Sequence, residues 1–347
     1  MSKKEANKYV AVGGQALMEG IMMKGPKGTA MSLRLPDKSI ETQMKEQVSL
    51  RKKYKFFNIP ILRGIVSFVE SLVSGYKYLM ESAEKTGLDL DSTENESKLD
   101  RWITEHFGKK MMTVIGVISG VLGVGLALLL FMYLPSLAFD LLNDYVADGK
   151  LDFLRAVFEG LIRIVIFVAY MAIVARMKEI RRVYMYHGAE HKTIFCFESG
   201  EELTVENVRK QSRFHPRCGT SFIFVTILLS ILISSVVAVV FPEVTQTRLI
   251  WVAVKLLMMP VIMGIGFEFI QLAGKYPNKF TRLLSMPGLL MQRITTAEPT
   301  PDMIEVAIAA MKAALTGEVE MQEKTEETAA AAEESVDGET AENTNEN

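Results

Sequence analysis

Hydrophobic and polar residues alternate near the start of the chain, as expected of a small β unit. The turn sequence PDKS, residues 36–39, separates two short runs in which every second residue is of one kind. These are Met31, Leu33 and Leu35 before the turn, and Ile40, Thr42 and Met44 after it. Alternation at every second position is typical of a strand with one buried face. We therefore expect a hairpin here, within a cytoplasmic β-rich unit that covers residues 1–58. The glycines of this unit match no phosphate-binding loop, and most are assigned to turns.

After Pro60 the pattern changes to the three-and-four spacing of an amphipathic helix. The apolar positions are Leu62, Ile65, Val69, Leu72, Tyr76 and Leu79, while Arg63, Glu70 and Lys77 lie elsewhere on the helix. These charges argue against a membrane span, so the helix is expected to lie on the inner membrane surface or to pack on another helix of the chain. An acidic polar linker at 87–100 completes a segment that covers residues 59–100.

Four long apolar runs come next, each close to the ~20 residues that a bilayer requires. They lie near residues 111–134, 157–175, 221–241 and 249–273, inside a membrane domain at 101–296. The second run carries Glu159 and Arg163, four residues apart, a spacing that lets the two charges neutralise each other. The fourth contains Lys255 and Glu268, and its Pro260 is expected to bend the helix.

Two further segments follow the last apolar run. Residues 275–293 mix basic and apolar side chains, which indicates an interfacial segment. A cytoplasmic helix is expected at 297–317, since Thr300 is suited to cap it, Pro301 to begin it and Gly317 to end it. This helix has one apolar stripe and needs a surface to cover it. The acidic tail at 318–347 cannot bury enough apolar surface, so it is expected to be disordered.

Composition and charge relate these elements to a membrane. The 347 residues are 49% hydrophobic, and the formal charge of −2 becomes +8 without the acidic tail. Lys and Arg accumulate in cytoplasmic loops. Residues 176–220 hold nine of them, whereas residues 135–152 hold four Asp and one Lys. Both termini and the motif loop at 176–220 are therefore expected in the cytoplasm, and no cleavable signal peptide is recognised.

The fold class predicted from these patterns is an α-helical polytopic protein of the cell membrane. It has four transmembrane helices, an N-in/C-in topology, a small N-terminal cytoplasmic β unit and interfacial amphipathic helices. The two cysteines both lie in the motif loop. Because no disulfide framework is possible beyond that loop, we interpret them as reduced thiols.

The chemistry of the chain is concentrated in residues 187–220, which hold three of its four histidines and both cysteines. On a helix, the spacing H-x-x-E-H puts His187, Glu190 and His191 on one face. This is the reverse of the zincin motif, in which two histidines hold a divalent metal and the glutamate acts as general base. The spacing therefore indicates a metal site, with Glu190 as the catalytic residue.

Such a site needs a further ligand, and several residues of the loop qualify. His215 and Cys218 in the sequence HPRC are the natural suppliers, with Cys196 and Glu198 closer in the chain. The predicted ligand set is thus His187, His191, His215 and Cys218, and the expected cofactor is a divalent metal, zinc in the first instance.

Three other residues are candidates for auxiliary roles. If the second span continues as a helix beyond the membrane, it carries the histidine pair to the surface from which the third span departs. The fourth span returns to that surface with Glu268 one to two turns inside, where a metal cation or Arg217 would be its partner. Glu19, an acid set between apolar residues near the N-terminus, is the third candidate, although a surface position explains it more simply.

Several alternatives to a catalytic metal remain open at this stage. The histidines could belong to a polar surface helix, to a structural metal site, or to an acid–base site without metal. Cys218 could also act as a nucleophile paired with His215. The basic residues of the loop are explained by lipid head groups, and nothing resembles a nucleic-acid-binding module. Membrane lipids, and other membrane proteins, are the expected partners.

These motifs resemble a known family. The sequences GGQALMEGIMM, HGAEHKTI, LTVEN, HPRCGTSF and EPTPDMIEVAI are similar to those of the YqhQ-like family of bacterial multi-pass membrane proteins. The resemblance extends to about Ile308 and excludes the acidic tail. It implies a protein of the cytoplasmic membrane, whose family is of unknown function and is sometimes described as metal-dependent enzymes. The family signature falls on His187, Glu190, His191, His215 and Cys218, with Glu19 in the N-terminal motif.

The leading hypothesis is a metal-dependent enzyme, most simply a hydrolase, at the inner face of the cell membrane. A second hypothesis is a non-catalytic membrane scaffold or biogenesis factor, in which the motif only folds the loop. A transporter is the third, because Glu159, Arg163, Lys255 and Glu268 are charges within spans, although no internal repeat supports it.

Overall fold

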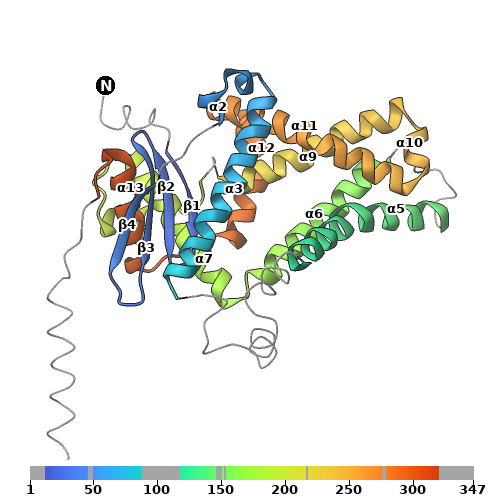
Figure 1. The fold of residues 1–347 in the computed structure, drawn as a ribbon. Coiled ribbons are helices and arrows are strands. Elements are labelled where there is room, and N and C mark those ends of the chain that lie inside the picture. Colours follow the sequence, from blue (N-terminus) through green and yellow to red (C-terminus); the bar gives the residue numbers. More distant parts are fainter. Residues whose placement is uncertain are drawn as a thin grey trace, which may run out of the picture.

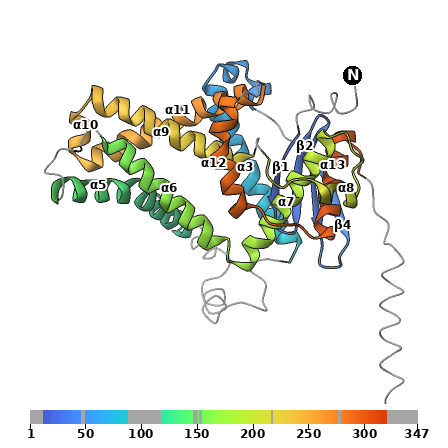
Figure 2. The same cartoon turned by 180° about the vertical axis from the view of Figure 1, so that it is seen from behind.

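The computed structural model of the protein describes residues 12–45, 50–87, 118–145, 151, 154–215, 218–275 and 279–319. A β-sheet with attached helices forms one end of the molecule, and long helices extend away from it (Figure 1). The view from behind shows the same two parts, with helices α3 and α12 between them (Figure 2).

The N-terminal β unit is an antiparallel meander of order β1-β2-β3-β4. Its strands are β1 Gly13–Leu17, β2 Gly20–Gly25, β3 Gly28–Arg34 and β4 Ile40–Lys45. The predicted hairpin is confirmed, because β3 and β4 pair on either side of the PDKS turn with Ser32 opposite Thr42. The hydroxyls of these two residues hydrogen-bond at 2.8 Å.

Three helices from distant parts of the sequence cover this sheet. They are α3 Leu62–Lys85, α7 Lys178–Glu198 and α13 Pro301–Thr316. Helices α7 and α13 share one core with the apolar residues on one face of the sheet, among them Ile21, Met23 and Ala30. Segments that the sequence presents as an N-terminal unit, a motif loop and a C-terminal helix therefore share a single core. The apolar stripe of α13 is therefore covered by the sheet and α7, as its pattern required.

The sheet is buried on both faces, which explains the two runs of alternating residues. Residues directly opposite each other in paired strands point to the same face. Met44 is opposite Ala30 and faces α13, whereas Met31 is one position further on and faces α3. There Met31 and Leu33 pack against Tyr78. The two strands of the hairpin thus direct their alternating apolar residues to opposite sides.

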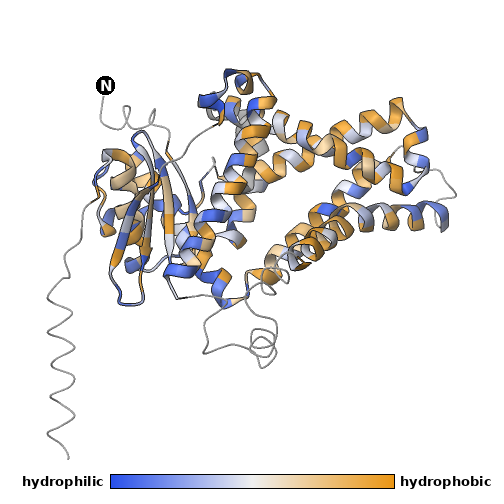
Figure 3. Cartoon of the chain, in the orientation of Figure 1, coloured by the Kyte–Doolittle hydropathy of each residue, from blue (hydrophilic) through white to orange (hydrophobic). Residues whose placement is uncertain are grey.

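Four helices are long and apolar enough to cross a membrane, as the hydropathy pattern predicted. They cover Ile118–Tyr145, Arg155–Val174, Phe222–Val240 and Arg248–Phe269. These stretches include α5 Leu134–Tyr145, α6 Arg155–Val174, most of α9 Gly219–Val240 and most of α11 Arg248–Lys275. Apolar residues dominate these helices, while polar residues are frequent on the sheet and its helices (Figure 3).

The remaining described elements are shorter or lie between the two parts. They are α2 Leu50–Lys53, the 3-10 turn Lys55–Asn58, the π-helical turn Leu129–Tyr133, α8 Val205–Lys210, α10 Glu243–Gln246 and α12 Lys279–Thr295. Helix α12 packs on α9 and leads through a short extended segment into α13.

The first apolar helix extends further at its C-terminal end than the sequence indicated. Instead of ending near Leu134, it continues to Tyr145 through part of the expected acidic loop. Asp140 is accommodated because two basic side chains meet its carboxylate, Nη2 of Arg155 at 2.8 Å and Nε of Arg248 at 2.7 Å. An acid with two cationic partners does not need to lie in a loop.

The expected pairing of Glu159 with Arg163 is wrong. The buried carboxylate of Glu159 accepts hydrogen bonds from Nζ of Lys255 at 2.5 Å and from Nε1 of Trp251 at 3.0 Å. Arg163 instead donates to the carbonyl of Phe131 at 2.9 Å. The spacing along one helix did not decide the partner, because α11 brings a cation that points directly at the carboxylate.

The second span does not run on as one helix into the histidine motif. Helix α6 ends at Val174, Met177 is extended with φ −69° and ψ 135°, and α7 begins at Lys178. Because an extended residue breaks the helix, α7 can leave the direction of α6 and pack against the sheet.

The amphipathic helix α3 packs on the fourth span, which confirms one of its two expected settings. Nε of Arg63 donates to Glu268 at 2.6 Å, and Nη2 of the same residue forms a second bond to that carboxylate. The helices approach closely at Gly64, where a Cβ atom would lie 3.0 Å from the Cα of Gly264. A small residue is therefore required at this crossing.

Several predicted features lie outside the described residues. These are the first residues of the β unit before Val12, the linker at 88–100, the start of the first span before Ile118 and the acidic tail from Glu320 onward.

The shared core makes a prediction about α13. Ile304 is fully buried between α13 and the sheet, so Ile304→Ala should lower the free energy of unfolding by about 2–5 kcal/mol. Val319→Ala, at a position that is 39% exposed, should change it by less than about 0.5 kcal/mol. The thermal midpoint of the purified protein in detergent measures both, and equal midpoints for the two variants would contradict the shared core.

Candidate functional site

The histidines of the HGAEH motif lie one turn apart on α7, and Cys218 joins them from the start of α9. The ring centroids of His187 and His191 are 4.4 Å apart. Sγ of Cys218 lies 3.3 Å from Nε2 of His187 and also hydrogen-bonds to His191. One ligand atom from each of the three residues lies within 4.8 Å of the other two. Two loop segments 27 residues apart in sequence, at positions 191 and 218, thus meet at one point.

The orientation of both imidazoles is fixed by backbone carbonyls. Nδ1 of His187 lies 2.9 Å from the carbonyl of Thr295, and Nδ1 of His191 lies 2.6 Å from that of Arg213. A carbonyl oxygen can only accept, so each Nδ1 carries a proton and donates it. Nε2 is then left with a free lone pair on both rings. This is the tautomer in which histidine binds a metal, with Nδ1–H held by an outer partner.

Burial supports the same protonation state at His191. This residue is 2% exposed, and burial lowers its pKa, although its hydrogen bond with Cys218 acts in the opposite direction. The imidazole is therefore neutral at neutral pH, as a metal ligand must be.

The C-terminal end of α12 holds this arrangement together. The side-chain amide of Gln292 accepts a hydrogen bond from the backbone N–H of His215 at 2.7 Å and donates one to the backbone carbonyl of the same residue at 2.8 Å. Nη1 of Arg213 donates to the carbonyl of Thr296 at 2.9 Å. Gln292, Thr295 and Thr296 are all buried. These residues were not predicted, and their one signal in the sequence is a polar Q-x-x-T-T pattern at the end of a segment that mixes basic and apolar residues.

Gly188 permits the close approach of the α12–α13 connection to the motif. A Cβ atom at this position would lie 2.1 Å from the carbonyl oxygen of Ala297. No side chain fits there without displacing the backbone that also bonds to His187. The glycine between the motif residues therefore serves the geometry of the site.

His215 lies beside the three-residue cluster but is not one of its members. Its ring centroid is 5.7 Å from that of His191 and 4.6 Å from that of Phe195. Its Nε2 is 3.6 Å from a carboxylate oxygen of Glu198. The predicted fourth ligand thus lies in the second layer around the cluster, next to an acid that the sequence analysis considered as an alternative ligand.

Glu190 points toward the N-terminal strand. Its carboxylate is buried, and the backbone N–H of Gly14 donates to it. A Cβ atom at Gly14 would lie only 3.0 Å from the carboxyl carbon, so the glycine makes this contact possible. Burial raises the pKa of Glu190 to about 7, while His187 and the Gly14 hydrogen bond lower it. This glycine lies within β1 beside the motif, so it is not among the glycines that turns explain.

The auxiliary candidates have other partners. Glu19, in the turn between β1 and β2 with φ +49°, accepts hydrogen bonds from Arg182 at 2.5 Å and from Tyr186 at 3.3 Å. Glu268 is paired with Arg63, as described above, and not with the histidine cluster. Arg217 lies outside the described residues.

Cys196 is also directed away from the cluster. Its thiol donates to the carbonyl of Glu202 at 3.4 Å, and burial raises its pKa to about 11. A thiol with such a pKa is protonated at neutral pH and is a poor ligand or nucleophile.

Comparison with known proteins agrees with the motifs. A family model described as "Protein of unknown function (DUF1385)" matches residues 59–317. The chain is 33% identical over 304 residues to the "Uncharacterized protein YqhQ" of Bacillus subtilis (strain 168), an alignment that covers 86% of this chain and 90% of that protein. No solved structure is similar to the chain. The resemblance based on GGQALMEGIMM, HGAEHKTI and HPRCGTSF is confirmed, and the chain belongs to the DUF1385 family of proteins of unknown function.

Proposed function

We propose that this protein binds one divalent metal ion, with zinc as the expected ion, through Nε2 of His187, Nε2 of His191 and Sγ of Cys218. The observation that carries the proposal is the convergence of three ligand atoms, two of them on imidazoles whose Nδ1–H groups are already held. Imidazole nitrogen and thiolate sulfur are both established ligands of zinc.

The spacing of these atoms supports the proposal. With metal–nitrogen bonds of about 2.0 Å and metal–sulfur bonds of about 2.3 Å, tetrahedral ligand atoms lie roughly 3.5 Å apart. The distance of 3.3 Å between His187 Nε2 and Cys218 Sγ is close to that value. Three protein ligands are the number found in catalytic zinc sites, which keep one position for water or substrate.

On this basis we propose a metal-dependent hydrolase. A bound metal supplies a Lewis acid and lowers the pKa of a water molecule. Glu190 is the residue that would accept a proton, because its pKa of about 7 allows both protonation states near neutral pH. The Gly14 N–H orients its carboxylate, and His215, whose backbone is held by Gln292, places its imidazole beside the cluster.

The activity would take place at the cytoplasmic face of the cell membrane. Helix α7, the 201–215 segment and the end of α12 lie at the same end of the helices as the sheet. Residues 176–220 hold nine Lys and Arg, which supports a cytoplasmic location by the positive-inside rule.

A non-catalytic scaffold is the second candidate, and one observation favours it. Helix α3 exposes an apolar stripe on the side away from the sheet. Its members are Val69, Leu72, Val73 and Tyr76, each at least 50% exposed. Such a surface fits lipid or another membrane protein, and in this case the metal would only fold the motif.

The first prediction is that the purified protein contains one divalent metal ion per chain. His187→Ala, His191→Ala and Cys218→Ala should each weaken binding by more than the roughly 10–100-fold that loss of an outer partner costs. Gln292→Ala, which removes only the clamp on His215, should stay within that range. Elemental analysis and competition with a chelator provide the measurement.

Thiol reactivity gives an independent control for metal binding. Half-buried Cys218 should react with a maleimide in metal-free protein and be protected when metal is added, whereas Cys196 should react slowly in both states because it is buried and its pKa is raised. Unprotected Cys218 in protein that contains stoichiometric metal would exclude it as a ligand.

Glu190→Gln separates the enzyme from the scaffold. The amide is isosteric and Gly14 can still donate to its oxygen, so metal content and thermal midpoint should be preserved. An enzyme that depends on proton transfer should then lose the function of the gene in a deletion strain, as expected for loss of a contribution of about 10²–10⁴-fold. Full complementation by Glu190→Gln together with failure of His187→Ala would favour the scaffold.

The proposed orientation is tested by a reporter fusion. A phosphatase that is active only outside the cytoplasm, fused after Gly317, should be inactive, whereas a fluorescent protein fused at the same point should be bright. The opposite result would place the histidine cluster on the outer face.

A further inference from the structure

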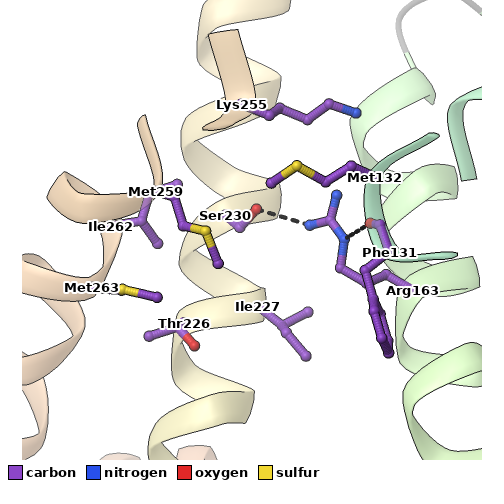
Figure 4. A pocket seen from close by; sticks show the side chains of 10 residues that line it. All are labelled: Phe131, Met132, Arg163, Thr226, Ile227, Ser230, Lys255, Met259, Ile262 and Met263. Atoms are coloured by element: carbon purple, nitrogen blue, oxygen red, sulfur yellow. Dashed lines mark hydrogen bonds between the residues drawn. The ribbon is translucent and has the colours of Figure 1, made fainter. Parts of the chain in front are cut away.

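A second feature of chemical interest lies among the apolar helices, far from the histidine cluster. A cavity of about 130 Å³ opens between the first, second, third and fourth spans. Its lining is mostly apolar, with Phe131, Met132, Ile227, Met259, Ile262 and Met263, and it also includes Lys255, whose amine is paired with Glu159. Figure 4 shows the guanidinium of Arg163 directed into this space, with Ser230 and Thr226 on the facing helix.

Arg163 has no carboxylate in direct contact among the described residues, and Glu159, one helical turn earlier, attracts it only at longer range. Nε donates to the carbonyl of Phe131 at 2.9 Å, and Nη1 donates to the hydroxyl of Ser230 at 3.0 Å. Both acceptors are neutral, and no ion pair to Arg163 is formed within the described part of the chain. A guanidinium has five N–H donors, so these two bonds leave donors available on the cavity side.

The neighbouring acids are already shared between other bases. Glu159 forms an ion pair with Lys255 at 2.5 Å and a more distant one with Arg155 at 3.8 Å. Asp140 forms ion pairs with Arg155 at 2.8 Å and with Arg248 at 2.7 Å. Among the described charges of these helices, Arg163 is thus the base without a carboxylate.

The backbone also departs from regular geometry at this point. The carbonyl that receives Arg163 belongs to the π-helical turn Leu129–Tyr133. In a π-helix the hydrogen-bond pattern is shifted by one residue, which makes carbonyls available to side chains, and such turns are frequent at functional sites. The turn therefore holds the guanidinium without supplying a negative charge.

An unpaired cation within a span is costly and is normally matched by a partner or a ligand. The space beside Arg163 is several times the roughly 30 Å³ that one water molecule occupies in the liquid, and its walls suit hydrocarbon. Its outer wall is accessible, since Met259 is 41% exposed. We propose that this cavity binds an anionic lipid through the phosphate or carboxylate of its head group. Arg163 and Ser230 donate hydrogen bonds to the anionic oxygens, and the acyl chain lies along the methionines of α11.

The experiment compares two lipids with identical acyl chains. Native mass spectrometry of the full-length protein in detergent should detect a single phosphatidic acid bound at least about tenfold more tightly than phosphatidylcholine. Arg163→Gln should remove that preference, a loss expected when one charge-assisted hydrogen bond disappears. Arg163→Lys, which keeps the charge, should retain most of it.

Two further variants keep the result interpretable. Met259→Trp narrows the entrance without removing a charge and should weaken phosphatidic acid binding even if Arg163→Gln does not fold. Arg176→Gln removes a charge at the exposed end of the second span, where the side chain bonds only to the Ala172 carbonyl of its own helix, and should leave binding unchanged.

A competition with inorganic phosphate distinguishes the two sources of the anion. Displacement of the lipid by phosphate alone would identify the oxygen group as a sufficient ligand, and resistance to phosphate would identify the whole lipid. Equal binding of the two lipids by the unchanged protein, or a preference that survives in folded Arg163→Gln, would overturn the proposal. Phosphatidic acid binding that is unchanged in Met259→Trp would overturn it as well.

Discussion

Helix α7 is held by hydrogen bonds to segments that are far from it in sequence, and the candidate site depends on them. The connection after α12 accepts a hydrogen bond from the imidazole of His187, and it can approach so closely because residue 188 is a glycine. Strand β1 donates a hydrogen bond to Glu190, and the 201–215 segment accepts one from His191. Each bond fixes one polar side chain of the motif in a largely buried environment, where an unsatisfied group would be costly. Removing any of the three neighbours would leave one of these side chains without a fixed orientation.

Features that follow from local periodicity were predictable. The β3–β4 hairpin, the apolar helices and the one-turn spacing of His187 and His191 result from repeats of two or of about 3.6 residues, which a sequence displays directly. The approach of Cys218 to this pair also followed, because the second and third spans had to leave and enter the same side.

Partner choice was not predictable, because it depends on how helices are rotated and how closely they pack. Glu159 had an ion-pair partner at the ideal spacing, yet Lys255 from α11 occupies its carboxylate. Gln292 is invisible as a site residue, since its role is to bond the backbone of His215 and not to carry chemistry. Gly14 resembled a turn glycine, and only the packing of β1 on α7 reveals that it makes room for Glu190.

The assembly of the sheet-containing unit has a consequence for biosynthesis. The strands end at Lys45, but α13, which covers one face of the sheet, begins only at Pro301, after all four apolar helices. At about 5–20 residues per second, the ribosome needs roughly 13–50 s to synthesise the intervening chain. During that interval Ile21 and Met23 lack their final neighbours. The four apolar helices are therefore synthesised while one face of the nascent sheet still lacks the helix that finally covers it.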